Sequence, residues 1–130
     1  MTRDSERGAV AVEFAILLPV LLLILMGIVE FGRAYNAQIS ITHAAREGVR
    51  VMAIQNNQAS AKTAAKNAAV SLNPALQDSD ITITTTNAAN TTLCAASSRA
   101  TFTISYSLSS LTGIAGPLTL KGKGVMQCGG

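Results

Sequence analysis

A long apolar stretch near the N-terminus constrains this chain more than any other feature. It runs from Gly8 to Val29 and reads GAVAVEFAILLPVLLLILMGIV, with Glu13 as its only charged residue. A helix formed by residues 9–29 would span roughly 30 Å, about the hydrocarbon thickness of a bilayer. We therefore expect residues 9–29 to form a transmembrane helix, kinked at Pro19 because proline lacks a backbone donor. The rest of the chain is then held at a membrane.

A secretory signal peptide is the main alternative for this stretch. Its apolar core measures about 7–15 residues and is followed by a cleavage site with small residues. The apolar run here is longer, no convincing site of that kind follows it, and no cysteine comes directly after it. The orientation stays open on charge alone, because Arg3 and Arg7 precede the run while Arg33, Arg46 and Arg50 follow it.

The remaining residues are sufficient for one small domain. About a hundred residues remain, enough for a modest hydrophobic core. Aromatic residues make up only 4% of the chain and Trp is absent, so this core must be built mainly from small and aliphatic side chains. The net charge of +3 is too small and too scattered to indicate a nucleic-acid partner.

An amphipathic helical pattern continues beyond the apolar run. Larger apolar residues recur there every three or four positions, and most polar residues fall elsewhere. The recurring residues are Ile28, Phe31, Tyr35, Ile39, Thr42, Ala45, Val49 and Met52. We expect one helix from about Ala9 to Gln55, whose amphipathic part, residues 30–55, packs against the rest of the domain. The small residues of the Ala44–Gly48 run suit either a partner helix or the chain's own sheet.

The sequence after Gln55 predicts a short helix followed by strands. Ser60 is suited to cap an Ala-rich helix over residues 60–72, which Asn73-Pro74 would end. Alternating apolar and polar residues predict three strands, and a Gly- and Pro-containing connection joins the last two. The strands are expected at about 80–86, 99–108 and 118–126. The predicted fold class is α+β: a long N-terminal helix, a short helix, and a small antiparallel β-sheet packed on the amphipathic half of the long helix.

Two cysteines, Cys94 and Cys128, lie in the predicted domain. An even number of cysteines beyond a membrane segment fits one disulfide in an oxidising compartment. Two unrelated buried thiols are the alternative.

The other polar residues of the domain contain no recognisable catalytic or cofactor site. His43 is the only histidine and has no second potential ligand nearby, so we interpret it as a surface or packing residue. The run from Lys121 to Gly124 lacks the spacing of a phosphate-binding loop and is interpreted as a charged edge strand or turn. Asn90-Thr-Thr92 matches a glycosylation sequon. We expect neither an enzyme nor a cofactor.

Three segments of the chain carry a dense and ordered pattern. They are residues 7–19 (RGAVAVEFAILLP), 27–35 (GIVEFGRAY) and 44–50 (AAREGVR). This pattern closely resembles TadE-like proteins, which are pilin-like minor components of bacterial tight-adherence (Tad/Flp) systems and relatives of type IV pili. The resemblance covers residues 7 to about 53. The size of the chain favours the TadE-like subgroup over the longer TadG and the shorter Flp pilins, and TadF-like proteins are close.

The resemblance implies that residues 1–8 are a prepilin-type leader. A membrane-bound prepilin peptidase would cut between Gly8 and Ala9, leaving Glu13 as the fifth residue after the cut. Phe14 stands where Flp pilins often have Tyr. Gly8 would supply an unhindered, non-helical junction for the peptidase. The resemblance also implies an inner-membrane protein with a cytoplasmic N-terminus, whose residues 30–130 form a periplasmic or extracellular pilin-like domain.

A carboxylate inside a bilayer costs on the order of 2.5–3.5 kcal/mol on insertion scales, so Glu13 needs an explanation. Near the edge of the segment it would reach the membrane surface or be protonated. The resemblance implies instead that Glu13 and Phe14 take part in subunit assembly. After cleavage, the freed amine of Ala9 on a neighbouring subunit would pair with Glu13.

The implied function is that of a minor pseudopilin, which takes part in assembling Tad/Flp type IV pili for adhesion. Its implied partners are the prepilin peptidase, inner-membrane lipid and other pilin-like subunits, namely Tad/Flp pilins and a TadF-like pseudopilin. The alternative is a single-pass, membrane-anchored binding domain that does not polymerise and keeps residues 1–8.

Overall fold

The computed structural model describes residues 2–86 and 93–129, with side chains from Glu6 onward. The chain divides into two compact units, Met1–Arg33 (unit 1) and Ala34–Gly130 (unit 2), which are described separately. Met1 of the predicted leader and the sequon at Asn90–Thr92 lie outside the described residues.

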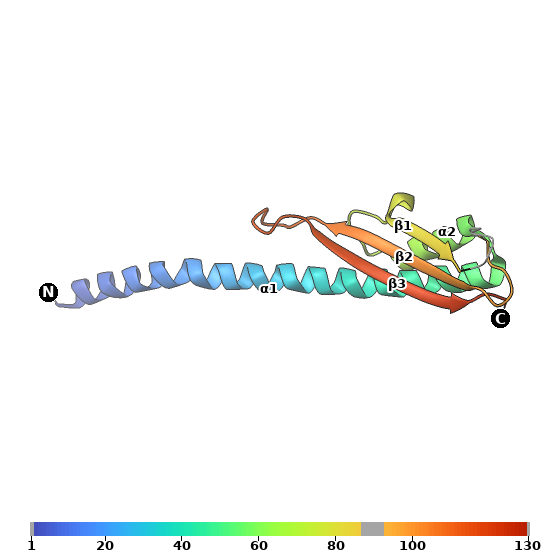
Figure 1. Ribbon diagram of the computed structural model, residues 1–130. Helices are drawn as coiled ribbons and strands as arrows, with labels where there is room; N and C mark the ends of the chain where they lie inside the picture. The colour runs from blue at the N-terminus through green and yellow to red at the C-terminus, as the bar shows by residue number, and fades with distance from the viewer. Residues whose placement is uncertain (1, 87–92, 130) are drawn as a thin grey trace. The chain divides into compact units, whose positions relative to one another are not determined.

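The elements confirm the predicted α+β class. In chain order they are α1 (Thr2–Gln55), α2 (Gln58–Ala68), the 3-10 turn η1 (Asp78–Asp80), β1 (Ile81–Thr85), β2 (Arg99–Leu108) and β3 (Leu118–Gln127) (Figure 1). Helix α1 contributes residues to both units. The helix continues through Pro19 and begins seven residues earlier than predicted, at Thr2 rather than Ala9.

Unit 2 contains an antiparallel sheet with one buried and one polar face. The strand order is β1-β2-β3, and Ile83 pairs with Phe102, which in turn pairs with Gly124. The buried face carries the apolar side chains of β1 and β2, of which Phe102 and Tyr106 are the largest. The opposite face is rich in Thr and Ser, an arrangement typical of antiparallel sheets with one solvated side. Of the two interpretations of the Lys121–Gly124 run, the structure therefore selects the edge strand.

Helix α1 approaches the sheet very closely because glycines lie between them. A Cβ atom added to Gly48 would lie 2.5 Å from the ring of Phe102. One added to Gly122 would lie 2.6 Å from the backbone oxygen of Ile41, and one on Gly124 would collide with the Ala45 carbonyl group. The Ala44–Gly48 run thus faces the chain's own sheet rather than a partner helix.

The buried face of α1 differs from the predicted face in its first turns. Ala45, Val49 and Met52 are buried as predicted, but Tyr35 and Ile39 are exposed. The small residues Ala37 and Ala44, together with Ile41, take the inner positions instead. Because the glycines of β3 admit the helix backbone so closely, small side chains such as those of Ala37 and Ala44 fill inner positions in these turns. Tyr35 and Ile39 therefore lie on the outer side of the helix.

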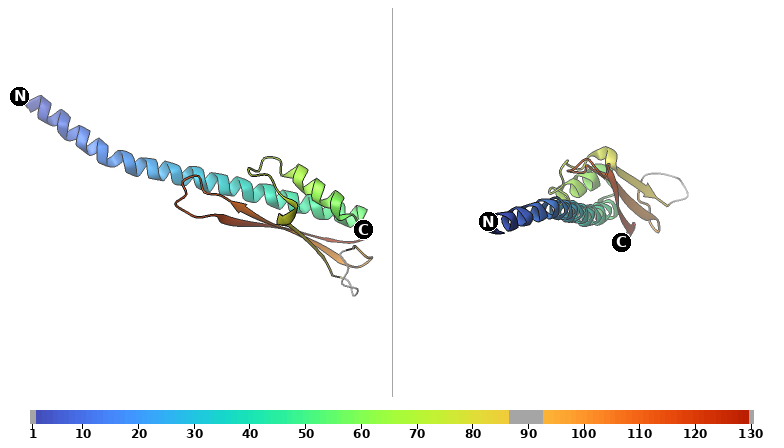
Figure 2. Two further views of the ribbon diagram at one scale, coloured as in Figure 1. Left: turned by 90° about the horizontal axis from the view of Figure 1, so that it is seen from above. Right: turned by 90° about the vertical axis from the view of Figure 1, so that its left-hand side faces the viewer.

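Helix α2 packs beside the second half of α1, and both cover the buried side of the sheet (Figure 2). Ser40 of α1 and Ser71 after α2 lie 3.3 Å apart between their hydroxyl oxygens. Ala61 and Ala65 face the core, as do Ala69 and Leu72 beyond the end of the helix.

The predicted bounds of α2 are wrong at both ends. Asn57, not Ser60, is the N-cap: it has an extended backbone, and its side-chain oxygen accepts the backbone N–H of Ser60 at 3.0 Å. The helix ends at Ala68 instead of residue 72. Asn is as good an N-cap as Ser, so the polar break before the helix already contained the cap.

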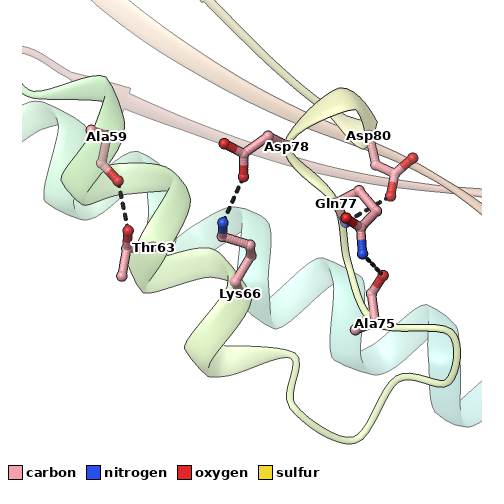
Figure 3. A network of polar contacts seen from close by, with 7 residues as sticks. All are labelled: Ala59, Thr63, Lys66, Ala75, Gln77, Asp78 and Asp80. Atoms are coloured by element: carbon pink, nitrogen blue, oxygen red, sulfur yellow. Dashed lines mark hydrogen bonds and ion pairs between the residues drawn. The ribbon is translucent and has the colours of Figure 1, made fainter.

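The segment between α2 and β1 is held by polar contacts at the surface (Figure 3). Lys66 Nζ lies 2.6 Å from Asp78 Oδ1, and this hydrogen-bonded ammonium lowers the pKa of the Asp78 carboxyl from its ordinary value. Asp80 Oδ2 accepts the backbone N–H of Gln77 at 2.9 Å. These exposed contacts position the start of β1 and contribute little to stability individually.

A disulfide joins Cys94, before β2, to Cys128, after β3, with their Cα atoms 5.4 Å apart. The backbone N–H of Cys128 also donates to the Ser98 carbonyl at 2.8 Å, and that of Cys94 donates to Asn56 Oδ1 at 2.6 Å. The disulfide therefore fastens the segment before β2 to the end of β3, and the Cys94–Asn56 hydrogen bond holds the same segment at the end of α1.

Loss of this disulfide should destabilise unit 2. Its partners are separated by 34 residues, and closing a loop of that size typically stabilises a fold by about 2–4 kcal/mol. We expect the double variant Cys94→Ala/Cys128→Ala to unfold at a lower urea concentration than the parent, measured by circular dichroism in detergent. Reductant should lower the midpoint of the parent and leave that of the double variant unchanged. A parent midpoint that does not respond to reductant would contradict this expectation.

Candidate membrane and assembly site

The described part of unit 1 is a helix without a hydrophobic core of its own. Large apolar side chains are exposed along the whole stretch from Val10 to Phe31. The most apolar part of this helix has a mean hydropathy of 2.8, and none of it is buried. Such a surface needs lipid or another protein to cover it. The helix is long and apolar enough to be a single-pass membrane anchor. A signal sequence near an N-terminus meets the same criteria of length and composition.

The C-terminal end of the apolar segment is marked by an ion pair. Arg33 Nη1 lies 3.8 Å from Glu30 Oε2, one helical turn away. These are the first charged residues after Glu13. They define the point at which a helix passing through hydrocarbon would reach the polar surface of a membrane.

Gly8 and Ala9, the predicted cleavage pair, lie inside α1 and are exposed. The expectation of a non-helical junction at Gly8 is therefore wrong. Glu6 and Arg7 are good helix formers and no proline or turn sequence precedes them, so the helix extends past the junction. A Cβ atom added to Gly8 would meet nothing within 4 Å, which leaves the backbone at this point open to approach.

Glu13 and Phe14 lie one turn further along the same helix, and both are exposed. Ala9 and Glu13 are four residues apart, so they share a helix face, and the Glu13 side chain tilts toward the turn that contains Ala9. Phe14 is 60% exposed. The residues predicted to mediate cleavage and assembly are thus gathered within two turns of one uncovered helix.

Other sequence candidates lie apart from this site. His43 is exposed on α1 within unit 2, consistent with a surface residue. Among residues 6–86 and 93–129, no group of three or more His, Cys, Asp or Glu side chains is arranged to hold a metal ion.

Comparison with known proteins bears on this helix. The model of a family described as TadE-like protein matches residues 8–50. No curated protein and no solved structure matches the chain. The matched range begins at the predicted cleavage glycine, includes Glu13 and Phe14, and ends near the end of α1, so it rests on α1 alone. This match supports the identification of the chain as a TadE-like protein of the Tad pilus system.

Proposed function

We propose that this protein is a minor pseudopilin that joins or primes a Tad pilus or its inner-membrane platform. The observation that carries the proposal is the position of the family match, which covers Gly8, Ala9, Glu13 and the whole apolar part of α1. In this proposal the prepilin peptidase removes residues 1–8. The processed helix is then available to other pilin-like subunits, namely Tad/Flp pilins and a TadF-like pseudopilin, in a structure that serves adhesion.

The exposure of the apolar helix supports assembly through this segment. Its large apolar side chains from Val10 to Val29 are exposed, so lipid covers them before assembly and neighbouring helices cover them afterwards. A helix that is apolar on all sides suits burial on all sides.

The disulfide of unit 2 supports the proposed orientation. Disulfides persist in oxidising compartments such as the bacterial periplasm and are rare in the cytosol. Cys94 and Cys128 both belong to unit 2, so unit 2 belongs on the periplasmic or outer side and the N-terminus in the cytoplasm.

Processing can be tested by measuring the N-terminal sequence and intact mass of the protein from its native membrane. We expect a chain that begins at Ala9. The variant Gly8→Val should retain residues 1–8, because a branched side chain at the scissile bond obstructs the peptidase. Gly32→Val is the matched control, since a Cβ atom at Gly32 also meets nothing within 4 Å. This control should be processed like the parent.

Two other results would overturn the proposal. A parent chain that begins at Met1 or Thr2, in cells with an active prepilin peptidase, would favour a membrane-anchored binding domain that does not polymerise. A chain that begins after Val29 would show that residues 1–29 are a secretory signal peptide.

A further inference from the structure

The connection between β2 and β3 carries its apolar side chains on the outside. From Ser109 to Leu120 the chain has no charged residue. Leu111 and Ile114 in this connection are 59% and 81% exposed, and Leu118, the first residue of β3, is 49% exposed. Several large apolar side chains exposed on one short segment mark a surface that contacts a protein or a membrane.

Polar groups near the tip of this connection are bonded within it. The hydroxyl oxygens of Ser110 and Thr112 lie 3.0 Å apart. Ser110 Oγ accepts the backbone N–H of Gly113 at 3.1 Å, and Thr112 Oγ1 accepts that of Ile114 at 3.4 Å. The backbone donors of Gly113 and Ile114 are thus satisfied within the connection, which lowers the cost of bringing them to the edge of a bilayer.

Contacts between β3 and α1 show at which end of unit 2 the connection lies. Residue numbers rise together along the two elements: Gln38 Nε2 donates to the Lys121 carbonyl at 2.9 Å, and the next contacts join Gly122 with Ile41 and Gly124 with Ala45. Residues that precede Lys121 therefore lie toward the end of unit 2 at which α1 enters it. The connection projects from that end of the sheet (Figure 1).

This end of unit 2 is tied to the apolar segment by a short length of chain. Unit 2 begins at Ala34, five residues after Val29. Five residues span at most about 18 Å in any conformation, so the end of unit 2 at Ala34 stays near the membrane surface whatever the arrangement of the two units.

Two lysines follow the apolar connection directly. Lys121 and Lys123 are exposed and lie on the polar face of the sheet, in its edge strand β3. The backbone of Lys121 is held by the hydrogen bond from Gln38. Basic side chains beside an apolar segment are attracted to anionic lipid head groups, and their long stems let the ammonium reach the membrane surface.

We propose that the β2–β3 connection is a second membrane contact. Leu111, Ile114 and Leu118 insert into the surface of the bilayer that the N-terminal helix crosses, and Lys121 and Lys123 bind its anionic head groups. The partner is a lipid surface. The contact needs α1 to be anchored but does not depend on leader cleavage or on assembly, so it fails or stands separately from the proposed pseudopilin role.

The absence of Trp from the chain allows a direct test. The variant Ile114→Trp places a single Trp at the tip of the connection. The full chain is reconstituted into phosphatidylcholine vesicles with or without phosphatidylglycerol, and with ordinary or brominated acyl chains. We expect the emission maximum to lie at a shorter wavelength than in detergent, and brominated lipid to quench most of the emission. Quenching should be stronger in vesicles that contain phosphatidylglycerol.

Ile54→Trp is the matched control. Ile54 is the same residue type, is 69% exposed on α1 within unit 2, and lies roughly 30 Å further along the helix than Ala34. Brominated lipid should leave its emission almost unchanged. Both substituted positions are exposed, and an unchanged urea midpoint will verify that the fold is retained.

Three outcomes would overturn the proposal. The first is an Ile114→Trp emission that brominated lipid does not quench. The second is equal quenching at positions 114 and 54. The third is that an aqueous quencher fails to reach the Trp at position 114 in native membranes but reaches it in lipid vesicles. This result would assign the connection to a protein partner.

Adding Lys121→Glu and Lys123→Glu to Ile114→Trp should remove the extra quenching caused by phosphatidylglycerol. If the triple variant keeps all of the extra quenching caused by phosphatidylglycerol, the lysines do not bind the anionic head groups.

Discussion

Gly124→Val is expected to lower the free energy of unfolding of unit 2 by about 3 kcal/mol or more, at the upper end of the range for overpacked cores. The first added carbon would already collide with the Ala45 carbonyl group and lie 3.0 Å from a Val49 methyl. The obstacle is helix backbone rather than the end of a flexible side chain. Relief therefore requires β3 and α1 to separate, which also loosens the contacts of Gly122 with Ile41.

The measurement is urea unfolding of the full chain in detergent, followed by near-ultraviolet circular dichroism. Both tyrosines belong to unit 2, and of the two only Tyr106 is buried, so this signal reports mainly on the packing of unit 2 around Tyr106. Gly124→Ala should fall between the parent and Gly124→Val, because it adds the colliding carbon without the branches. Gly116→Val is the matched control: a Cβ atom there meets nothing within 4 Å, and its midpoint should stay close to that of the parent. Equal midpoints for Gly116→Val and Gly124→Val would show that β3 does not press on α1.

Local patterns in the sequence predicted most of the elements of unit 2. Alternation over residues 99–108 matches β2 at both ends, and the same rule locates β1 and β3 within one residue at each end. Each of these strands buries one face, so apolar and polar side chains must alternate along it, and this alternation can be recognised in the sequence. The 3-10 turn at Asp78–Asp80 was not predicted, because its hydrogen bonds depend on Gln77 and Asp80 rather than on any apolar period.

The helix face that packs on the sheet was harder to predict, for a physical reason. Periodicity arguments weight large apolar residues, and these marked Tyr35 and Ile39 as inner positions. In the structure the contact is set by Gly122 and Gly124, which bring two backbones together and leave room chiefly for small residues on α1. The informative signal was the placement of both glycines at inward-facing positions of one strand.

The candidate assembly site could be predicted from the sequence for a different reason. Its residues lie close together along one helix, so their mutual placement follows from helix geometry alone. The β2–β3 connection offers no such rule. Its apolar residues indicate a membrane contact only because they are exposed and lie at the end of unit 2 where α1 enters. Neither their exposure nor that position could be predicted from the sequence.

Glu13→Ala is expected to abolish most of the association of the processed protein with other pilin-like subunits. In the proposed assembly, the freed amine of Ala9 on one subunit pairs with the Glu13 carboxylate of its neighbour within an apolar surround. Removing one member of a buried ion pair leaves the other charge uncompensated and costs about 3–5 kcal/mol. A loss of that size weakens association at least about a hundredfold. The measurement is the fraction of the protein recovered with Tad/Flp pilins from solubilised membranes and sheared pili.

Val12→Ala is the matched control, which distinguishes the effect of the Glu13 charge from that of the apolar surface around it. Val12 is the preceding residue, is 61% exposed on the same helix, and loses methyl groups but no charge in this variant. It should be recovered with the pilins nearly as well as the parent. The intact mass of Glu13→Ala must also show that the chain begins at Ala9. A chain that retains residues 1–8 would mean that the peptidase recognises Glu13, and the loss of recovery could then not be assigned to assembly. Recovery of correctly processed Glu13→Ala at the level of the parent would mean that the carboxylate reaches the membrane surface as a solvated group and pairs with no neighbouring subunit.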